Sequence, residues 1–108
     1  MPQYIFIYLG GEHSNDPTES KKHFDKYQQW LSALSDSVVS PAIPFKDTHT
    51  VYSDGRIEQG TTTLMSGMSI LKFESMQAAL EAARTCPFLE IKGTLEVSEM
   101  IEMSKTVN

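Results

Sequence analysis

The chain has 108 residues, of which 9 are basic and 14 acidic, for a formal net charge of −5. This length predicts a single domain over residues 1–108, large enough for a core but small enough to gain stability from an oligomer interface. The acidic balance argues against nucleic acid as a partner, because phosphates require a basic face, and against an anionic membrane surface. The longest apolar run, Tyr4 to Leu9, is too short to cross a bilayer.

Two features bear on the compartment. The first residues contain neither a charged segment nor the cleavable apolar stretch of a secretory signal. The single cysteine, Cys86, excludes a disulfide within the chain. We therefore expect a cytoplasmic protein.

The run from Tyr4 to Leu9 predicts the first strand, which ends at Gly10. Both faces of this strand are apolar, one aromatic and one aliphatic: Tyr4, Phe6 and Tyr8 against Ile5, Ile7 and Leu9. A strand at the surface would carry one polar face. This strand is therefore expected at the centre of a sheet, covered on both sides.

Asp16 and the residues after it predict the start of a helix. Asp16 suits the capping position, Pro17 the first turn and Glu19 the third helical position. The helix is expected to reach about Leu34, with one apolar stripe facing the core. This stripe consists of Phe24, Tyr27, Leu31 and Leu34, widened by Trp30.

Prolines mark the second strand, Val38 to Pro44, as an edge strand, because proline cannot donate a hydrogen bond to a neighbouring strand. A small hairpin is expected from Thr48 to Glu58, with Asp54-Gly55 as its turn. The Thr-rich segment from Gly60 to Ser66 then connects the hairpin to the next strand.

The last part of the chain has the most regular pattern. Met68 to Phe73 predicts a strand, and Ser75 stands where a helix-capping hydroxyl belongs. The Ala-rich helix after Ser75 is expected to end near Thr85, since Pro87 cannot continue it. A last strand is expected from Thr94 to about Met103.

The order of these elements predicts an α+β fold of the ferredoxin-like βαββαβ type with a hairpin insertion. Its four-stranded antiparallel sheet would carry both helices on one face. Two helices leave the other face open, although the first and third main strands are apolar on both sides. A second copy of the chain is the simplest candidate to bury this open face, so we expect a homodimer or a higher assembly of dimers.

Most of the chain resembles the YCII-related family. The resemblance is carried by the opening strand ending at Gly10, Tyr27 with Trp30-Leu31, Thr50-Val51 with Asp54-Gly55, and above all Ser66-Gly67 through Glu96-Val97. Its most specific runs are Ala78-Ala79-Leu80-Glu81-Ala82-Ala83, Cys86-Pro87 and Gly93-Thr94-Leu95-Glu96-Val97. The resemblance implies the dimeric α/β barrel version of the ferredoxin-like fold.

The resemblance implies little about activity. Most family members have no assigned function, and a few are proposed to be lyases or dehydrochlorinases of small aromatic compounds. Their suggested site combines a His on the first helix with an Asp in the loop before the third main strand. Here the helix carries His23, although the family position falls nearer Asp25 or Lys26. The loop from Gly60 to Met65 has no carboxylate, which favours a copy without catalysis.

Two histidines are candidate catalytic bases, because imidazole titrates near neutral pH. His23 lies on the first helix, and His13 lies beside Glu12 in the loop after the first strand. An ordinary surface position is the alternative for each. Glu12, His13 and Asp16 could supply metal ligands, but their spacing matches no established site, so no metal is expected.

Tyr4, Tyr8 and Met68 are candidate ligand-binding residues. The tyrosines could line an apolar pocket with hydroxyls as polar handles, and methionine adapts to many shapes. Packing in the core or at a dimer interface is the alternative, and it is favoured for Phe6. Cys86, near the C-terminal end of a helix, is expected to be a buried structural thiol.

Two functions remain open. The first is a homodimer that binds a small organic molecule; catalysis would then be acid–base chemistry of the lyase or isomerase type without a cofactor, with His13 or His23 as base and Tyr8 as a polar partner. The second is an interaction or regulatory module that uses the sheet face and does no chemistry. A pocket containing a His of perturbed pKa would favour the first, and a flat, packed face the second.

Overall fold

The computed structural model describes residues 1–12 and 15–101. Its elements in chain order are β1 (Gln3–Gly10), α1 (Pro17–Ala33), the 3-10 helix η1 (Ser35–Ser37), β2 (Val38–Pro44), β3 (His49–Val51), β4 (Ile57–Gln59), β5 (Met65–Lys72), α2 (Met76–Ala83), the 3-10 helix η2 (Pro87–Ile91) and β6 (Gly93–Glu99). Four strands form an antiparallel sheet in the order β2-β5-β1-β6. This confirms the ferredoxin-like α+β fold.

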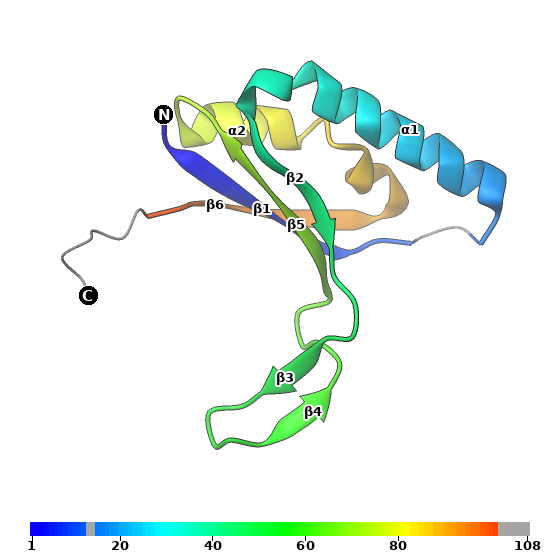
Figure 1. Ribbon diagram of the computed structural model, residues 1–108, viewed down its shortest axis with the longest axis vertical. Helices are drawn as coiled ribbons and strands as arrows, with labels where there is room; N and C mark the ends of the chain where they lie inside the picture. Colours follow the sequence, from blue (N-terminus) through cyan, green and yellow to red (C-terminus); the bar gives the residue numbers. More distant parts are fainter. Residues whose placement is uncertain (13–14, 102–108) are drawn as a thin grey trace.

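The two helices cover one face of this sheet, and the hairpin of β3 and β4 projects away from it (Figure 1). The hairpin turns where predicted: Gly55 has a φ of 88°, which favours glycine, and Arg56 N–H donates to Asp54 Oδ1 over 2.9 Å. Among the described residues, no helix is long and apolar enough to cross a membrane.

β1 lies at the centre of the sheet, as its two apolar faces predict. Its aromatic residues Tyr4, Phe6 and Tyr8 face the helices and are at most 5% exposed. Its aliphatic residues Ile5 and Ile7 face the other way and are half-buried. The alternation of a strand therefore assigns the aromatic side chains to the core.

The sheet face away from the helices carries an apolar strip. Directly paired residues share a face, and Ile5 pairs with Ile70, Ile7 with Met68, and Ile43 of β2 with Met68. We call Ile5, Ile7, Met68, Ile70 and Ile43 the open strip. Ile43 is 46% exposed, and the other four are half-buried. The described residues leave this face uncovered (Figure 1).

α1 begins and ends close to the predicted positions. Asp16 caps it, accepting a hydrogen bond of 2.9 Å from the backbone N–H of Thr18. Four residues of the predicted stripe pack in the core: Tyr27, Trp30, Leu31 and Leu34. Phe24 does not join them and is 59% exposed. The prediction for Phe24 was wrong because it lies over a cavity between α1 and the edge strand, where there is no sheet to cover it.

The second half of the chain shows the predicted order with shifted boundaries. Ser75 caps α2, accepting from Ala78 N–H over 3.2 Å. The helix ends at Ala83, with Arg84 as its C-cap, slightly before the expected end, because the N–H groups of Thr85 and Cys86 bond to carbonyls only three residues back. β5 begins early, at Met65, since its pairing with β1 continues past a bulge. β6 ends at Glu99, which pairs with Tyr4 near the start of β1; positions 102–103 of the predicted strand lie outside the described residues.

Trp30 joins the two helices. Its indole Nε1–H donates to Ala82 O over 3.2 Å and to Thr85 Oγ1 over 3.0 Å, at the C-terminal end of α2. These contacts satisfy the indole donor of a ring that is only 8% exposed. They hold α1 at a fixed position beside α2.

Candidate functional site

An aromatic cluster forms where β1, α1 and η2 meet. The ring centroids of Tyr8 and Tyr27 are 6.0 Å apart with the rings edge to face, and those of Tyr8 and Phe88 are 5.2 Å apart. Trp30 extends the cluster, with its centroid 5.5 Å from that of Tyr27. Offset and edge-to-face geometries are favoured for aromatic pairs, so the cluster fixes the ring positions.

Hydrogen bonds join the hydroxyls of Tyr8, Tyr27 and Ser69. Tyr8 Oη lies 2.7 Å from Ser69 Oγ and also bonds to Tyr27 Oη. Burial raises the pKa of Tyr8, while the bonds from Ser69 and Tyr27 partly lower it. Burial and then the bond to Tyr8 raise the pKa of Tyr27 far above its usual range. Both phenols therefore stay protonated at physiological pH.

A cavity of about 660 Å³ opens between α1 and the β2 edge of the sheet. We call it the α1 cavity. Its wall is mostly apolar, and the hydroxyl-bearing residues Tyr8 and Tyr27 belong to it. The other contributors from the helix are Ser20, His23, Phe24, Gln28 and Leu31, and those from the strands and η2 are Pro41, Ala42, Ile43, Pro44, Ser66, Gly67 and Phe88. The volume lies in the range of small-molecule pockets.

Two local features create this space. β2 contains Pro41 and Pro44, and its pairing with β5 is irregular on both sides of Ser40. On β5, Gly67 stands opposite Tyr8 and has no side chain to fill the wall. A Cβ at Gly67 would lie 2.9 Å from the carbonyl oxygen of Ile43, so a larger residue would push the edge strand away.

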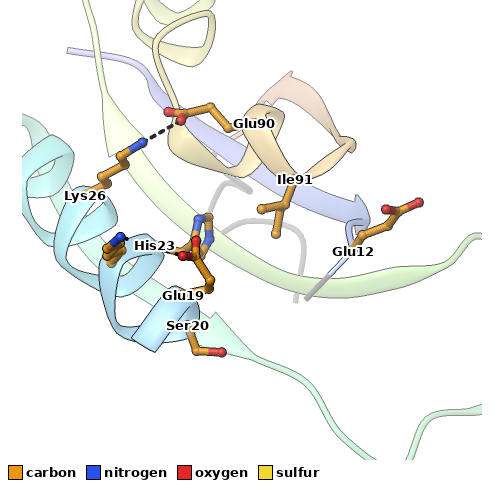
Figure 2. A pocket seen from close by; sticks show the side chains of 8 residues that line it. Glu12, Glu19, Ser20, His23, Lys26, Glu90 and Ile91 are labelled. Carbon is orange, nitrogen blue, oxygen red and sulfur yellow. Dashed lines mark hydrogen bonds and ion pairs between the residues drawn. The ribbon is translucent and has the colours of Figure 1, made fainter. Parts of the chain in front are cut away.

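A second, smaller hollow of about 300 Å³ adjoins the same part of α1 (Figure 2). Most of the residues that line it are charged, and two of them form an ion pair, with Lys26 Nζ 2.9 Å from Glu90 Oε1. These side chains are more than half exposed, so the ion pair contributes little to stability. Ser20 and His23 line both spaces. His23, which is half-buried, therefore stands at the junction between an apolar cavity and a charged hollow.

The structure brings together two of the predicted site residues, Tyr8 and His23, in the wall of the α1 cavity. Tyr4 is 1% exposed and packs against Phe73 in the core. Met68 is separated from both tyrosines, because its pairing with Ile7 places it on the opposite face of the sheet. His13 lies outside the described residues.

Sequence reasoning missed the polar role of Tyr27 and Ser69. Tyr27 was assigned to the apolar stripe of the helix, where its ring indeed packs, but its hydroxyl reaches Tyr8. Ser69 is 0% exposed within an apolar strand. A serine among apolar neighbours on a central strand is itself a signal, because a buried hydroxyl needs a polar partner.

A metal centre is not expected from the sequence. Within residues 1–12 and 15–101, no group of three or more His, Cys, Asp or Glu side chains is arranged to hold a metal ion. His49, on the exposed hairpin, pairs with Asp47, with Nδ1 and Oδ1 3.7 Å apart.

Cys86 is buried, as predicted for a structural thiol. It lies between α2 and η2, is 2% exposed, and its neighbour Pro87 is buried as well. Burial raises the pKa of the thiol to about 11, although a backbone hydrogen bond from Phe88 partly lowers it. Because the thiolate is the reactive form, this cysteine is a poor nucleophile.

The raised pKa of Cys86 predicts a stability that falls in alkali. An unfolded cysteine ionises near ~8.5, so between that pH and about 11 the folded state keeps a proton that the unfolded state has lost. The free energy of unfolding should therefore decrease as pH rises through this window, by on the order of 2 kcal/mol more in the wild type than in Cys86→Ala. Urea denaturation of both proteins across this window measures the difference. Parallel pH profiles would contradict the assignment.

Comparison with known proteins gives a similarity to a solved structure. No protein-family model and no curated protein matches the sequence. The structure is similar to that of 5-chloro-2-hydroxyhydroquinone dehydrochlorinase from Burkholderia phenoliruptrix AC1100, solved in complex with 2,5-dihydroxybenzoquinone. The TM-score is 0.58 at 13% sequence identity, over 95% of this chain and 97% of that chain. The similarity confirms the ferredoxin-like α+β fold. At a sequence identity this low, the fold is all that the similarity shows.

Proposed function

We propose that the protein binds a small, mostly apolar organic molecule with oxygen substituents in the α1 cavity. The observation that carries this proposal is a cavity of about 660 Å³ whose mostly apolar wall includes Tyr8, Tyr27 and a few other polar residues. Such a wall supplies binding energy through burial, and its few polar groups orient the ligand. The complex of the structurally similar dehydrochlorinase with 2,5-dihydroxybenzoquinone supports this class of ligand.

The proposal extends to acid–base chemistry without a cofactor, with His23 as the base. His23 lies in the wall of the α1 cavity, where a bound molecule would be within its reach. The same residue borders the charged hollow, through which a proton could pass to solvent. His13 remains a second candidate base. This chemistry is that of a lyase or isomerase, and the fold similarity to a dehydrochlorinase supports it.

We also propose that the chain is a distant member of the YCII-related family. It would then be a cytoplasmic homodimer. The open strip supports the dimer, because apolar side chains at the centre of a sheet are usually covered. A partner protein on this strip is the alternative, in which the chain would be an interaction or regulatory module without catalysis.

Filling the α1 cavity should abolish binding. Ala42 lies in its wall, so Ala42→Phe should weaken the binding of 2,5-dihydroxybenzoquinone or related hydroxylated aromatics by at least about tenfold, because the added ring occupies their place. Isothermal titration calorimetry measures the affinity. The matched control is Ala33→Phe at an exposed end of α1, which should bind as the wild type does. Equal affinities of the two variants would contradict the location.

Removing the proposed base should affect turnover more than binding. With 5-chloro-2-hydroxyhydroquinone as substrate and chloride release as the readout, His23→Gln should lower kcat by roughly 10²- to 10⁴-fold and change KM little, because a general base acts in the transition state. The control is His49→Gln on the exposed hairpin, which should leave kcat unchanged. If the wild type binds ligands but releases no chloride from this compound, dehydrochlorination is excluded as its reaction.

A charge in the open strip should separate the dimer. Light scattering of the wild type should give twice the chain mass of 12.1 kDa. Ile70→Lys should give the single-chain mass, because it buries a charge at the interface. The control Gln29→Lys, on the exposed side of α1, should stay dimeric. If the wild-type protein has the mass of a single chain, the dimer is contradicted and the open strip would bind another partner.

A further inference from the structure

The four-stranded sheet has two edge strands, and the chain protects them unequally. β2 carries Pro41 and Pro44, which cannot donate a hydrogen bond to an added strand, and its pairing with β5 is irregular. β6 is seven residues long, pairs with β1 without a register shift, and contains neither proline nor lysine. In the part of the chain that the structure describes, no strand lies on its outer side. Further strands add to regular, unprotected edges of this kind.

The pairing of β6 with β1 shows which backbone groups this edge presents. The N–H of Met100 donates to the carbonyl oxygen of Gln3 over 2.8 Å, in the same register as the rest of the pair. Hydrogen-bonded positions alternate along an antiparallel pair, so Glu96 also bonds to β1. Leu95 and Val97, at the positions between, direct their N–H and C=O groups away from β1. The edge therefore offers donors and acceptors to an added strand.

An apolar groove lies beside this edge, on the face that carries the helices. Its volume is about 460 Å³, its wall is mostly apolar, and α2, η2 and β6 all contribute to it. Leu95 and Val97 line it from the strand. Leu80 and Leu89 line it from the helices and are 45% and 39% exposed. Apolar side chains of an added strand would cover these two leucines. No described residue lines both this groove and the α1 cavity.

The opposite face of β6 carries a negative charge. Glu96 is exposed, and its pairing with Ile7 places it at the margin of the face that carries the open strip. Within residues 1–12 and 15–101, it forms no ion pair. Side chains of an added strand alternate as those of β6 do, so two that enter the groove flank one that lies beside Glu96. A lysine or arginine there would complement the carboxylate, in keeping with the net charge of −5.

A second copy of β6 fits this edge less well than a basic segment does. Antiparallel pairing of two copies over the whole strand sets Gly93 opposite Glu99 and therefore Glu96 opposite the same residue of the second copy. Like charges directly opposite each other destabilise a sheet. A shifted register separates the two carboxylates but leaves part of each strand unpaired. The charge thus favours a different chain as the occupant.

We propose that the β6 edge and the groove beside it bind an extended segment of another protein in which a basic side chain stands between two apolar ones. The segment becomes a fifth strand of the sheet. Its backbone bonds to Leu95 and Val97, its apolar side chains lie in the groove, and its basic side chain contacts Glu96. This site is separate from the α1 cavity and does not depend on the binding proposed there.

Synthetic peptides and the full-length chain test this interaction. The probe is Gly-Ser-Thr-Val-Lys-Val-Thr-Ser-Gly. One comparison peptide has glutamate in place of lysine, and another has N-methyl groups on its three central residues. The wild type should bind the lysine peptide roughly threefold to tenfold more tightly than the glutamate peptide, because a cross-strand attraction replaces a repulsion. It should not bind the N-methylated peptide, which lacks the backbone donors. NMR titrations give the affinities.

Amide hydrogen exchange reports the addition of a strand directly. In the free protein, the amides of Leu95 and Val97 should exchange faster than that of Glu96, which already bonds to β1. The lysine peptide should slow the exchange at Leu95 and Val97 and change it least at Glu96. A ligand that merely covers this surface would not produce this alternation.

Variants assign the binding to its two faces. Glu96→Lys should reverse the order of the lysine and glutamate peptides. The control Glu74→Lys makes the same change in net charge at an exposed position outside β6 and should keep the wild-type order. Leu80→Gln should weaken binding of the lysine peptide severalfold, whereas Ile57→Gln, at a site 64% exposed on the hairpin, should not. All four positions are exposed, so the fold is kept, which circular dichroism confirms.

Each contrary result overturns a stated part of the proposal. Equal affinities of the wild type for the lysine and glutamate peptides overturn the basic partner. Undiminished binding of the N-methylated peptide overturns the addition of a strand. If the wild type binds none of the peptides at millimolar concentration, the whole proposal is overturned, including the case in which a second copy occupies the edge. The function proposed for the α1 cavity is unaffected by these results.

Discussion

The burial of the Tyr8 hydroxyl is the constraint on which the site depends. Tyr8 points into the core because β1 alternates, and its hydroxyl would be unfavourable there without partners. Ser69 supplies one partner from the neighbouring strand and Tyr27 the other from α1. The same contacts that satisfy the phenol therefore fix the helix over the sheet and place polar atoms at the wall of the α1 cavity.

The cavity exists because α1 and the edge strand do not close on each other. Trp30 anchors the C-terminal half of the helix through α2, while the N-terminal half extends past the packed core. The irregular β2 and the missing side chain at Gly67 leave a space beside the helix, which α1 lines from Ser20 to Leu31. A well-packed interior would have no room here.

Much of the fold could be predicted from local signals. Two apolar faces placed β1 at the centre, prolines placed β2 at the edge, and Ser75 marked the start of α2. These signals depend on single residues or on a period, which a sequence displays directly. Boundaries were less predictable: the end of β6 depends on where its antiparallel neighbour β1 begins, at the other end of the chain.

The site was less predictable because it depends on pairing between distant segments. The alternation within a strand groups Met68 with Ile70, but it does not say which group faces the helices; the pairing with β1 decides that Met68 faces away. Tyr8 and Ser69 are 61 positions apart in the sequence, and only the register of β1 against β5 brings them together. His23 could not be told from a surface residue, because the cavity beside it arises from irregularities in β2.

The position of Trp30 gives the molecule an optical reporter of its own. It is the single tryptophan of the chain, so the indole emission comes from one defined place. That place is shielded from water, hydrogen-bonded to the end of α2, and 5.5 Å from the ring of Tyr27. Indole fluorescence responds to the polarity and the aromatic neighbours around it. The emission of the unlabelled protein is therefore coupled to events at the wall of the α1 cavity and to the docking of the two helices.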